Sequence, residues 1–487
     1  MTTLVRPRAG SARPAALPDD ASARQTASRR QLVVGLAVAV AAGLGALVAP
    51  LSTGIALIAL ATLMYFAALV YRLAAFWLSL RHPQLEVITD EEARAIADDD
   101  LPVYTILVPA YHEASVMASL IGRLTELEYP VNKLDIRLLL ERDDLDTIAA
   151  AVAALPGPQF KIVRIPHSEP KTKPKACNYG LKGSTGEYVT IYDVEDRPEP
   201  LQLRRSIVAF RRLGPSVACL QAKLSYYNAE QNLLTSWFTI EYAMWFSFLL
   251  PGLVTQRGPL PLGGTSNHFR GKVLRAVGGW DPYNVTEDAD LGIRLARQGY
   301  ETRVLDSTTF EEANSDVINW VKQRSRWYKG YLQTWLVHMR HPLAIRRELG
   351  WKGFIGFNLF VAGTPLLSLM NPIFWGLTTL WFVVHPAVIL ALFPAWLYYL
   401  GLVVMILGNV SLFYSWLVSA RMAGSSRLVF ASLLIPVYWA LMSLAVIKAA
   451  VQLVSAPSFW EKTVHGLDRA ASPSADLLEP DVGLKSP

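Results

Sequence analysis

The sequence is poor in charged residues and almost without cysteine. Charged residues make up 18% of its 487 positions and hydrophobic residues 52%, so charge is scarcer and apolar side chains are commoner than in an average soluble protein. This composition argues against a wholly water-soluble chain and predicts that part of it lies in lipid. The two cysteines, Cys177 and Cys219, fall in a segment expected to be cytoplasmic, where disulfides rarely persist. We expect both to be thiols in a core.

A basic stripe of the kind that binds nucleic acid is also missing. The net charge of +6 is small for this length, and arginines gather in the first 30 residues, so membrane orientation explains the excess better than nucleic-acid binding. Residues 1–30 show no apolar period and are predicted to be a disordered basic tail. A cleaved signal peptide is disfavoured, because this charged tail is long, two apolar stretches follow it, and no convincing small-residue cleavage site is present.

Those two apolar stretches are residues 31–49 and 51–73, which are split by Pro50. Each is long enough to cross a bilayer core of about 30 Å, so residues 31–80 are predicted to form a transmembrane hairpin. The arginines of the tail, with Arg72 and Arg81 after them, place both flanks of the hairpin in the cytoplasm. The segment that follows is therefore expected to start on the cytoplasmic side.

Residues 81–350 change to an alternation of short apolar strands with helices, which is typical of a mostly parallel sheet covered on both faces. The predicted strands are residues 103–108, 135–140, 160–165 and 187–192, and the predicted helices are residues 115–127, 145–154 and 175–181. Such a doubly wound, Rossmann-like unit binds ligands outside the carboxyl ends of its strands. Residues 235–254 could pass for another membrane span, but their tryptophans and the need to keep the acidic motifs on one side favour a helix lying in the interface.

Four further apolar stretches follow in residues 351–455, at about 353–371, 373–391, 395–419 and 428–454. They are predicted to be four more spans, six in all, and an even count returns residues 456–487 to the cytoplasm. This arrangement leaves Arg421 and Arg427 outside, in mild conflict with the positive-inside tendency.

The most informative stretch is Asp193-Val194-Glu195-Asp196, because three carboxylates directly follow an apolar strand. A packed core would not tolerate them unpaired, and oxygen ligands suit Mg²⁺ or Mn²⁺. The sequence therefore predicts a divalent metal site that also binds a nucleotide diphosphate. Without other evidence, the alternative interpretation of these residues is a solvated acidic turn.

Three other clusters share this segment. Thr286-Glu287-Asp288 opens a helix, where a carboxylate is either a helix cap or a general base. Gln323, Arg326 and Trp327 share one face of a helix. The arginine offers a planar guanidinium to a diphosphate, and the tryptophan offers an apolar ring face to a sugar. A basic helix lying in the membrane interface is an equally good interpretation. Gly264-Thr265 belongs to a small-residue loop that lets a ligand approach the backbone.

In this order, the motifs resemble those of the membrane-embedded family 2 glycosyltransferases, the class of cellulose, curdlan and hyaluronan synthases. The resemblance covers nearly all of residues 33–467 and rests on Asp193-Val194-Glu195-Asp196, Thr286-Glu287-Asp288 and the Gln-x-x-Arg-Trp motif of Gln323 to Trp327. It implies a cytoplasmic GT-A domain between transmembrane helices, a nucleotide-diphosphate sugar donor, Mg²⁺ or Mn²⁺, inversion at the anomeric carbon, and a channel for the polymer.

The resemblance also implies a role for each matched residue. Asp288 would be the catalytic base, and Asp193 and Glu195 would hold the metal. Residues implied in donor binding are Tyr111, Glu113, Glu141, Asp143, Lys173, Asn178 and Arg326. Residues implied in acceptor binding are Thr286, Glu287, Gln323, Trp327, Gly264 and Thr265. Trp460, Lys462 and Thr463 are similar to a gating loop, and a plain juxtamembrane anchor is the other reading of that segment.

Three positions depart from the family's pattern. His112 stands where Asn is usual, and Glu195 replaces the second aspartate of the metal pair, so its longer arm would bind directly or through water. Glu141-Arg142-Asp143-Asp144 replaces an expected aspartate pair, which leaves open which carboxylate meets the nucleotide base.

These observations predict a multi-pass protein of a bacterial inner membrane that polymerises a sugar and extrudes the polysaccharide. UDP-glucose is the donor expected from family frequency. A non-processive enzyme that moves one sugar to a lipid acceptor is the main alternative, and a transport channel with an inactive transferase domain is another. Intact carboxylates at Asp193 and Asp288 argue against the last.

Overall fold

A nine-stranded mixed sheet forms the centre of the α/β domain in the computed structural model, which describes residues 17–154, 157–457 and 459–461. Its strand order is β1-β9-β7-β8-β5-β2-β3-β4, with β6 paired to β9. The strands are β1 (Leu85–Glu86), β2 (Tyr104–Ala110), β3 (Leu134–Glu141), β4 (Phe160–Ile165), β5 (Tyr188–Ile191), β6 (Arg197–Pro198), β7 (Val217–Tyr226), β8 (Asn267–Arg270) and β9 (Glu301–Glu311). Because β2, β3, β4 and β5 are parallel, their carboxyl ends open at one edge of the sheet.

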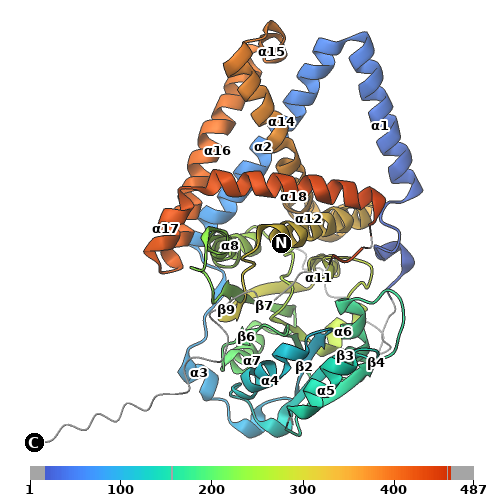
Figure 1. Cartoon of the computed structure of the whole chain (residues 1–487), viewed down its shortest axis with the longest axis vertical. Coiled ribbons are helices and arrows are strands. Elements are labelled where there is room, and N and C mark those ends of the chain that lie inside the picture. Colours follow the sequence, from blue (N-terminus) through green and yellow to red (C-terminus); the bar gives the residue numbers. More distant parts are fainter. Residues whose placement is uncertain (1–16, 155–156, 458, 462–487) are drawn as a thin grey trace, which may run out of the picture.

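Helices cover both faces of this sheet (Figure 1). They are α4 (Met117–Thr125), α5 (Leu145–Ala153), α6 (Lys173–Lys182), α7 (Gln202–Leu213), α10 (Gly271–Ala276) and α11 (Glu287–Arg297). Successive residues of β2 point to opposite faces, so Ile106 and Val108 join one hydrophobic core while Leu107 joins the other. Cys177 and Cys219 lie buried and free in that second core, as predicted.

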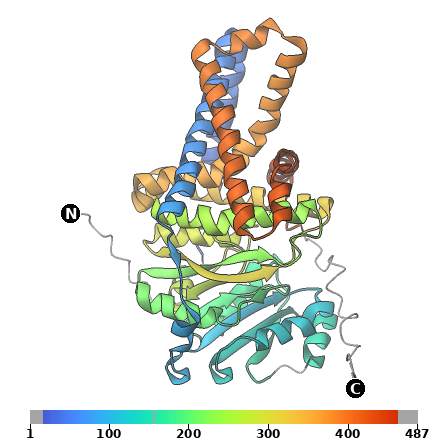
Figure 2. The same ribbon diagram turned by 90° about the vertical axis from the view of Figure 1, so that its left-hand side faces the viewer.

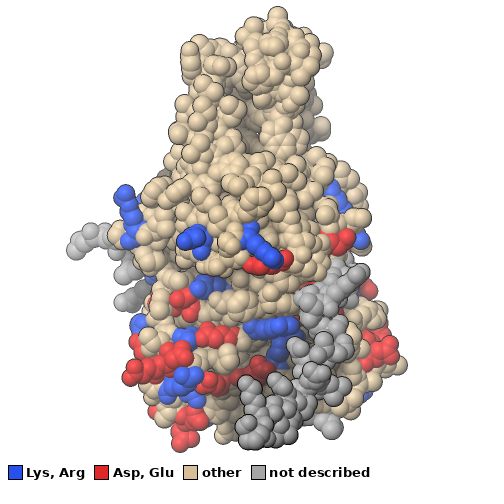
Figure 3. Space-filling view, turned by 60° about the vertical axis from the view of Figure 1, so that its left-hand side comes forward, with Lys and Arg blue, Asp and Glu red and all other residues tan. Residues whose placement is uncertain are grey.

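Four long apolar helices rise together from the domain, as Figures 1 and 2 show: α1 (Arg29–Val48), α2 (Pro50–Arg81), α14 (Gly363–Val384) and α16 (Ala395–Met422). A second set lies across their base and includes α8 (Leu233–Met244), α12 (Val317–His338) and α18 (Ile435–Ser455). In the space-filling view of Figure 3, the charged side chains lie around the α/β domain and the base, while the upper part of that face is uncharged.

Six helical runs are long and apolar enough to cross a membrane, and two of them belong to the N-terminal hairpin. The other four are Leu233–Thr255, Pro342–Val384, Ala395–Met422 and Ile435–Ser455. The run Leu233–Thr255 contains α8, a π-helical segment (Trp245–Leu249) and α9 (Leu250–Thr255), and α8 lies across the base of the upright helices (Figure 1).

The predicted division of residues 353–391 into two spans is wrong. Helix α13 (Pro342–Phe357) is kinked at Gly350, and from there it continues through a π-helical segment (Asn358–Ala362) into α14, with Pro372 inside α14. Proline removes one helical hydrogen bond, but long apolar helices tolerate it where neighbouring groups compensate. Residues 342–455 therefore contain three candidate spans rather than four, and the intervening α15 (Ala387–Leu392) and α17 (Ser426–Ser432) are short.

The position of the end of α16 bears on Arg421 and Arg427, which the predicted spans placed on the side opposite the α/β domain. Arg427 Nη1 lies 3.4 Å from a carboxylate oxygen of Glu230, which precedes α8. Because α14 and α16 form a hairpin, this end returns to the side of the α/β domain (Figure 2). The expectation that these arginines lie on the opposite side is wrong, because it depended on the extra span.

The prediction of a disordered tail is also wrong for residues 17–28. They contain a short helix, η1 (Asp19–Ala21), and Ser28 caps α1 through a reciprocal pair of hydrogen bonds with Gln31. Ser22 and Ala23 are buried. Local composition missed this order because the contacts that fix the segment come from residues about 260 to 320 positions away.

Candidate active site

A cavity of about 1540 Å³ begins at the carboxyl ends of the parallel strands and continues between the upright helices. At the sheet it is lined by Tyr111, Glu113 and Glu141, which follow or end β2 and β3. It passes the amino end of α11 and one face of α12, and then reaches α2, α14 and α16. The cavity thus joins the domain edge where ligands are expected to the membrane-type helices.

The loop after β5 divides the acidic cluster into two parts. Asp193 and Glu195 line the cavity, whereas Asp196 is fully buried behind the loop. The Asp196 carboxylate accepts a hydrogen bond from the Asp193 amide at 2.8 Å and another from the Thr265 hydroxyl. Asp196 therefore shapes the loop, while the carboxylates of Asp193 and Glu195 belong to the cavity wall.

Lys173, at the start of α6, is the cation at this cluster. Its Nζ lies 2.6 Å from Asp193 Oδ1 and donates to the Gly264 carbonyl at 2.8 Å. The charges of Asp193 and Glu287 raise the pKa of Lys173 against the opposing effect of burial, which acts most strongly. A permanently charged ammonium at this position suits a diphosphate.

The carboxylates of Asp193 and Glu195 fit a divalent ion whose coordination a bound donor would complete. Mg²⁺ is commonly held by one or two carboxylates together with substrate phosphates. No group of three His, Cys, Asp or Glu side chains that could hold an ion alone occurs among the described residues. Glu311, which sequence reasoning missed, also lines the cavity, and burial, followed by the charges of Asp196, Glu195 and Asp193, raises its pKa. A cation held by Asp193 and Glu195 would oppose this shift.

Asp288 stands on the first turn of α11 and faces the cavity. Its Oδ1 accepts a hydrogen bond from the Ala289 amide at 2.8 Å. A Cβ atom placed on Gly264 would lie 3.5 Å from Asp288 Oδ2 and 4.0 Å from Lys173 Nζ, so Gly264 brings the backbone between these groups. The predicted base and the predicted donor-binding lysine therefore meet around one glycine.

Asp288 and its neighbour Glu287 differ in their surroundings. Burial, and then the charge of Asp288, raise the pKa of Glu287 to about 8. Burial also raises the pKa of Asp288, but the Ala289 amide, Lys173 and Arg326 oppose the shift. The pKa of about 8 favours a proton on Glu287 near neutral pH, whereas the Ala289 amide, Lys173 and Arg326 favour the ionised form of Asp288, which is the state that a general base requires.

Helix α12 contributes Gln323, Arg326 and Trp327 to the cavity wall, as the helical spacing predicted. The Arg326 guanidinium lies 4.6 Å from the centre of the Trp460 ring, and Trp460 also lines the cavity. Trp327 is half-buried, with the Arg324 guanidinium 4.4 Å from its ring centre. This packing fixes the indole at the wall. Lys462 and Thr463, the other gating-loop candidates, lie outside the described residues.

The predicted donor-binding residues are only partly gathered at the cavity. Glu141 pairs with Lys175 at 2.9 Å, and Asp143 pairs on the outer side with Lys171 at 2.6 Å. Lys171 itself lines the cavity and lies 4.5 Å from the centre of the Tyr111 ring. Asp143 is therefore not part of the described cavity wall.

Asn178 occupies a different place from the one predicted. Its amide group donates to the Trp280 carbonyl at 2.6 Å and accepts from the Trp280 amide at 2.9 Å. Both hydrogen-bonding ends of the side chain are used on this turn, and Asn178 is absent from the described cavity wall. Its position on α6 turns it toward the loop before α11, so a role in donor contact is not supported.

Thr286, Glu287 and Thr265, predicted to contact the acceptor, all line the cavity. Thr265 donates to the Ile191 carbonyl at 3.0 Å, which ties the small-residue loop to the end of β5. Thr286 donates from its backbone to Asn284 at 3.0 Å. Lys171 and Glu311 also line the cavity but were not predicted as site residues. Each is a charged residue at or beyond the end of a strand, which is the signal that identified Asp193 and Glu195.

A comparison with protein families matches residues 188–460 to the family described as Glycosyl transferase family group 2, which is more than half of the chain. The chain belongs to this family. The predicted GT-A-like fold is likewise confirmed, with a mixed sheet, helices on both faces and flanking apolar helices. The narrower likeness to processive cellulose and hyaluronan synthases is not part of this finding.

Curated relatives include proteins named for different acceptors. The chain is 28% identical over 284 residues to the beta-monoglucosyldiacylglycerol synthase of Synechocystis, covering 56% of this chain and 58% of that protein. It is 27% identical over 278 residues to glucomannan 4-beta-mannosyltransferase 2 of Arabidopsis thaliana, covering 55% and 51%. The chain spans about half the length of the curated relatives it matches. A solved structure, the Pyrobaculum calidifontis mannosyltransferase in complex with GDP-Man and Mn²⁺, aligns at 18% identity with a TM-score of 0.49, over 82% of this chain and 98% of that one.

Proposed function

We propose that this protein is an inverting glycosyltransferase that moves a hexose from a nucleotide-diphosphate donor to a hydroxyl group of a membrane-anchored acceptor. The observation that carries the proposal is the continuity of the cavity, which joins Asp193 and Glu195 to Asp288 and then to α2, α14 and α16. The residues proposed to bind the donor and the helices proposed to admit the acceptor thus line the same cavity.

The charged part of the cavity supports the donor half of this reaction. Asp193 and Glu195 would hold Mg²⁺ or Mn²⁺, and the ion would neutralise charge on the departing diphosphate. Lys173 and Arg326 place two further cations on the same side of the cavity. Arg326 offers a planar fork that suits phosphate oxygens, whereas Lys173 acts as a point charge. These residues bind the donor and stabilise the leaving group.

Asp288 supplies the remaining chemical step. It accepts the proton of the acceptor hydroxyl, whose oxygen forms a bond to the anomeric carbon as the bond to the diphosphate breaks. One displacement of this kind inverts the configuration at that carbon. The neutral state of Glu287 keeps a second negative charge away from the incoming oxygen, and Glu287 and Thr286 line the path.

The membrane part of the cavity supports a lipid-anchored acceptor best. Its walls come from α2, α14, α15 and α16, and among the described residues none of α1 takes part. The lining there is largely apolar and aromatic, and it includes Leu377, Phe382, Ile389, Leu402 and Met405. Such walls suit acyl or prenyl chains, while the acceptor's polar end reaches Asp288.

Processive polymer synthesis, with extrusion through the chain's own helices, is the second candidate. It is favoured by Gln323 and Trp327, which line the cavity next to the reacting groups and could hold the end of a growing saccharide. In either case we propose a multi-pass protein of a bacterial inner membrane whose α/β domain faces the cytoplasm. UDP-glucose remains the first donor to try.

One experiment tests the function and separates the two acceptors. Full-length protein in lipid nanodiscs is incubated with a panel of labelled UDP- and GDP-sugars, Mg²⁺ or Mn²⁺, and a bacterial total lipid extract. We expect label in the organic phase as a lipid carrying one sugar, and none with the Asp288→Asn variant. A water-soluble, ethanol-precipitable product would establish the polymerase instead. Absence of both products with every donor, from protein that binds a nucleotide, would overturn the proposal.

A further inference from the structure

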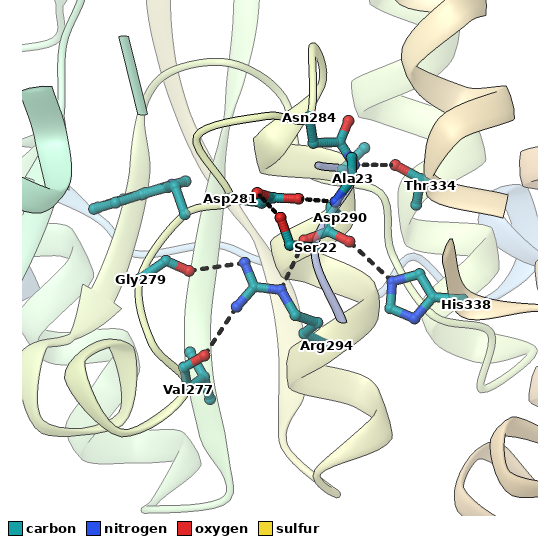
Figure 4. A network of polar contacts seen from close by, with 12 residues as sticks. Ser22, Ala23, Val277, Gly279, Asp281, Asn284, Asp290, Arg294, Thr334 and His338 are labelled. Carbon is teal, nitrogen blue, oxygen red and sulfur yellow. Dashed lines mark hydrogen bonds and ion pairs between the residues drawn. The ribbon is translucent and has the colours of Figure 1, made fainter. Parts of the chain in front are cut away.

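The segment before α1, residues 18–28, lies against the loop that leads into the catalytic helix. Ser22 and Ala23 are buried there, 6% and 0% exposed, although they belong to a stretch with no regular structure beyond η1. Figure 4 shows both residues beside Asp281, which stands seven positions before Asp288. An N-terminal segment is thus in direct contact with an active-site loop.

Asp281 is the centre of this contact. Its side chain is fully buried, and it accepts hydrogen bonds from the Ser22 hydroxyl at 2.8 Å and the Ala23 amide at 2.5 Å. The Tyr283 amide donates a third bond at 3.1 Å. Burial, followed by the charge of Asp290, raises the pKa of Asp281, and the hydrogen bonds from Ala23, Tyr283 and Ser22 oppose this shift. Two of the three come from residues 18–28.

Arg340, just after α12, holds the same segment from the other side. Its guanidinium donates to the backbone carbonyl of Asp20 at 2.5 Å, to that of Ser22 at 3.1 Å, and to that of Gln25. Gln31, in the first turn of α1, donates to the Leu336 carbonyl at 2.8 Å. Backbone carbonyls are acceptors whatever the side chains are, so the conformation of the segment is what is recognised.

The loop between α10 and α11, residues 277–286, is also held at other points. Asn284 donates to Thr334 of α12 at 2.9 Å and accepts from the Thr286 amide at 3.0 Å. At the loop's start, Arg294 donates to the carbonyls of Val277 and Gly279 at 2.9 and 2.7 Å (Figure 4). Beside Asp281, the Trp280 backbone is hydrogen-bonded to Asn178 and the Pro282 carbonyl accepts from Thr172 at 3.1 Å, so residues 18–28 hold the loop at the Asp281 side chain itself.

We propose that residues 18–28 act as a strap that fixes the loop before α11 and thereby sets the position of Asp288 relative to the acceptor. Asp281 is the positioning residue, and Ser22 and Ala23 are its anchors. This inference rests on the proposed function in one respect, because it takes Asp288 as the base. Since the strap continues directly into α1, it also connects the placement of the base to the first membrane helix.

The test compares Ser22→Ala, Ser22→Thr and Asp19→Ala in full-length protein. Ser22→Ala removes one anchor of Asp281, Ser22→Thr keeps the hydroxyl, and Asp19 is an exposed residue of the same segment that serves as a matched control. Release of UDP from UDP-glucose is followed in nanodiscs with a bacterial total lipid extract. Displacement of reacting groups by about 1 Å costs up to about 10²-fold in rate, so we expect Ser22→Ala to lower kcat about tenfold.

The expected pattern has three further parts. The KM for UDP-glucose and the pH profile stay as in the parent, because the donor site and the titrating groups are intact. Ser22→Thr and Asp19→Ala keep the parent kcat. Hydrogen exchange of the amides in residues 281–288 becomes faster in Ser22→Ala alone. A chain that starts at residue 28 should repeat the kinetic pattern more strongly, and size-exclusion chromatography and the thermal midpoint report whether each variant is folded.

A folded Ser22→Ala variant with the parent kcat and parent exchange at residues 281–288 would overturn the strap. So would a rise in KM with kcat unchanged, since that locates the effect in donor binding. These outcomes are distinct from failure of the proposed function, in which the parent protein itself transfers no sugar.

Discussion

The two ends of the cavity are built in different ways. At the sheet, charged side chains stand on strand ends and are held in pairs, such as Lys173 with Asp193 and Lys175 with Glu141. Between the upright helices, the wall is mainly apolar and aromatic, and Arg72 of α2 is held by a hydrogen bond to the Thr364 hydroxyl at 2.6 Å. The chemistry of the first end suits a charged ligand, and that of the second suits contact with an apolar molecule.

This difference separates the energetic effects of mutations. A charge removed at the sheet end is lost from a buried site where electrostatic interactions are strong, so rates and metal affinity should change by orders of magnitude. A ring removed near the membrane end takes away dispersion and apolar contact, which is worth less for each residue. Substitutions at the sheet end should alter every reaction, whereas those nearer the membrane should alter acceptor use.

The largest effect is expected for Asp288→Asn. The amide keeps the shape of the side chain but cannot accept the acceptor proton, so turnover should fall by about 10² to 10⁴-fold. Binding of UDP and of Mn²⁺, measured by calorimetry, should remain close to the parent values. The competing interpretation treats Asp288 as a helix cap, where Asn is nearly as good as Asp. Near-normal turnover of a folded variant would support the cap and reassign the base to Glu287, because Asp290 is buried in ion pairs with Arg294 and His338.

The same contrast explains what could be predicted from the sequence. The four parallel strands β2 to β5 match the predictions closely, because each is a short apolar run with polar residues at its end. Strands β7, β8 and β9 were not predicted. Their pairing joins Gln221 to Asn267 and to Val304, residues that are distant in the chain, and local periodicity does not encode such partners.

At the site, the ordered motifs correctly identified most residues of the cavity wall, but they did not predict where every side chain points. Asp193, Asp288 and Arg326 meet at the cavity as expected, whereas Asn178 turns to Trp280. A helix position specifies a face only after the neighbours of that helix are known. The layout of the membrane helices was predicted least well, since apolar composition does not tell a crossing helix from one lying at the base.

Glu195→Gln should produce the next largest effect. Loss of a residue that only orients a metal ligand lowers metal affinity by about 10- to 100-fold in many sites, and loss of a direct ligand should do no less. We therefore expect the Mn²⁺ concentration for half-maximal activity to rise at least about tenfold, with activity recovering at saturating metal. Glu199→Gln is a control, since Glu199 bonds to Arg205 and is not among the described wall residues. Unchanged metal dependence would leave Glu195 as a spectator and favour Asp193 with Asp196.

Trp327→Ala tests the wall between the two ends. Aromatic contacts contribute about 0.5–1.5 kcal/mol beyond buried area, so transfer to acceptor should fall roughly 3- to 10-fold. UDP affinity should change less than about twofold, because Arg326 rather than Trp327 is proposed to contact the phosphates. If the product is a polymer, elongation should be lost. Trp351→Ala, at a tryptophan that is 62% exposed, is the matched control. Weakened UDP binding with unchanged products would contradict the acceptor role.

The smallest effect is expected for Glu287→Gln, although the residue is adjacent to Asp288. With a pKa of about 8, Glu287 already carries a proton near neutral pH, and Gln imitates that neutral form. Turnover at neutral pH should therefore change by no more than about threefold. Above about pH 8 the parent gains a negative charge beside the base and the variant does not, so the two pH profiles of kcat should separate only on the alkaline side.

The pH dependence of folding stability gives an independent check, because its direction follows from the raised pKa of Glu287. The pKa of Glu287 rises from 4.5 unfolded to about 8 folded, so between these values the folded protein retains a proton that the unfolded chain has released. Folding stability of the parent then declines as pH rises through this window, and the Gln variant lacks this term. In detergent, the thermal midpoint of Glu287→Gln should exceed that of the parent by more at pH 8 than at pH 5. A large loss of turnover at neutral pH would instead show that Glu287 is ionised in the working enzyme, and the acid–base assignment of the pair would have to be exchanged.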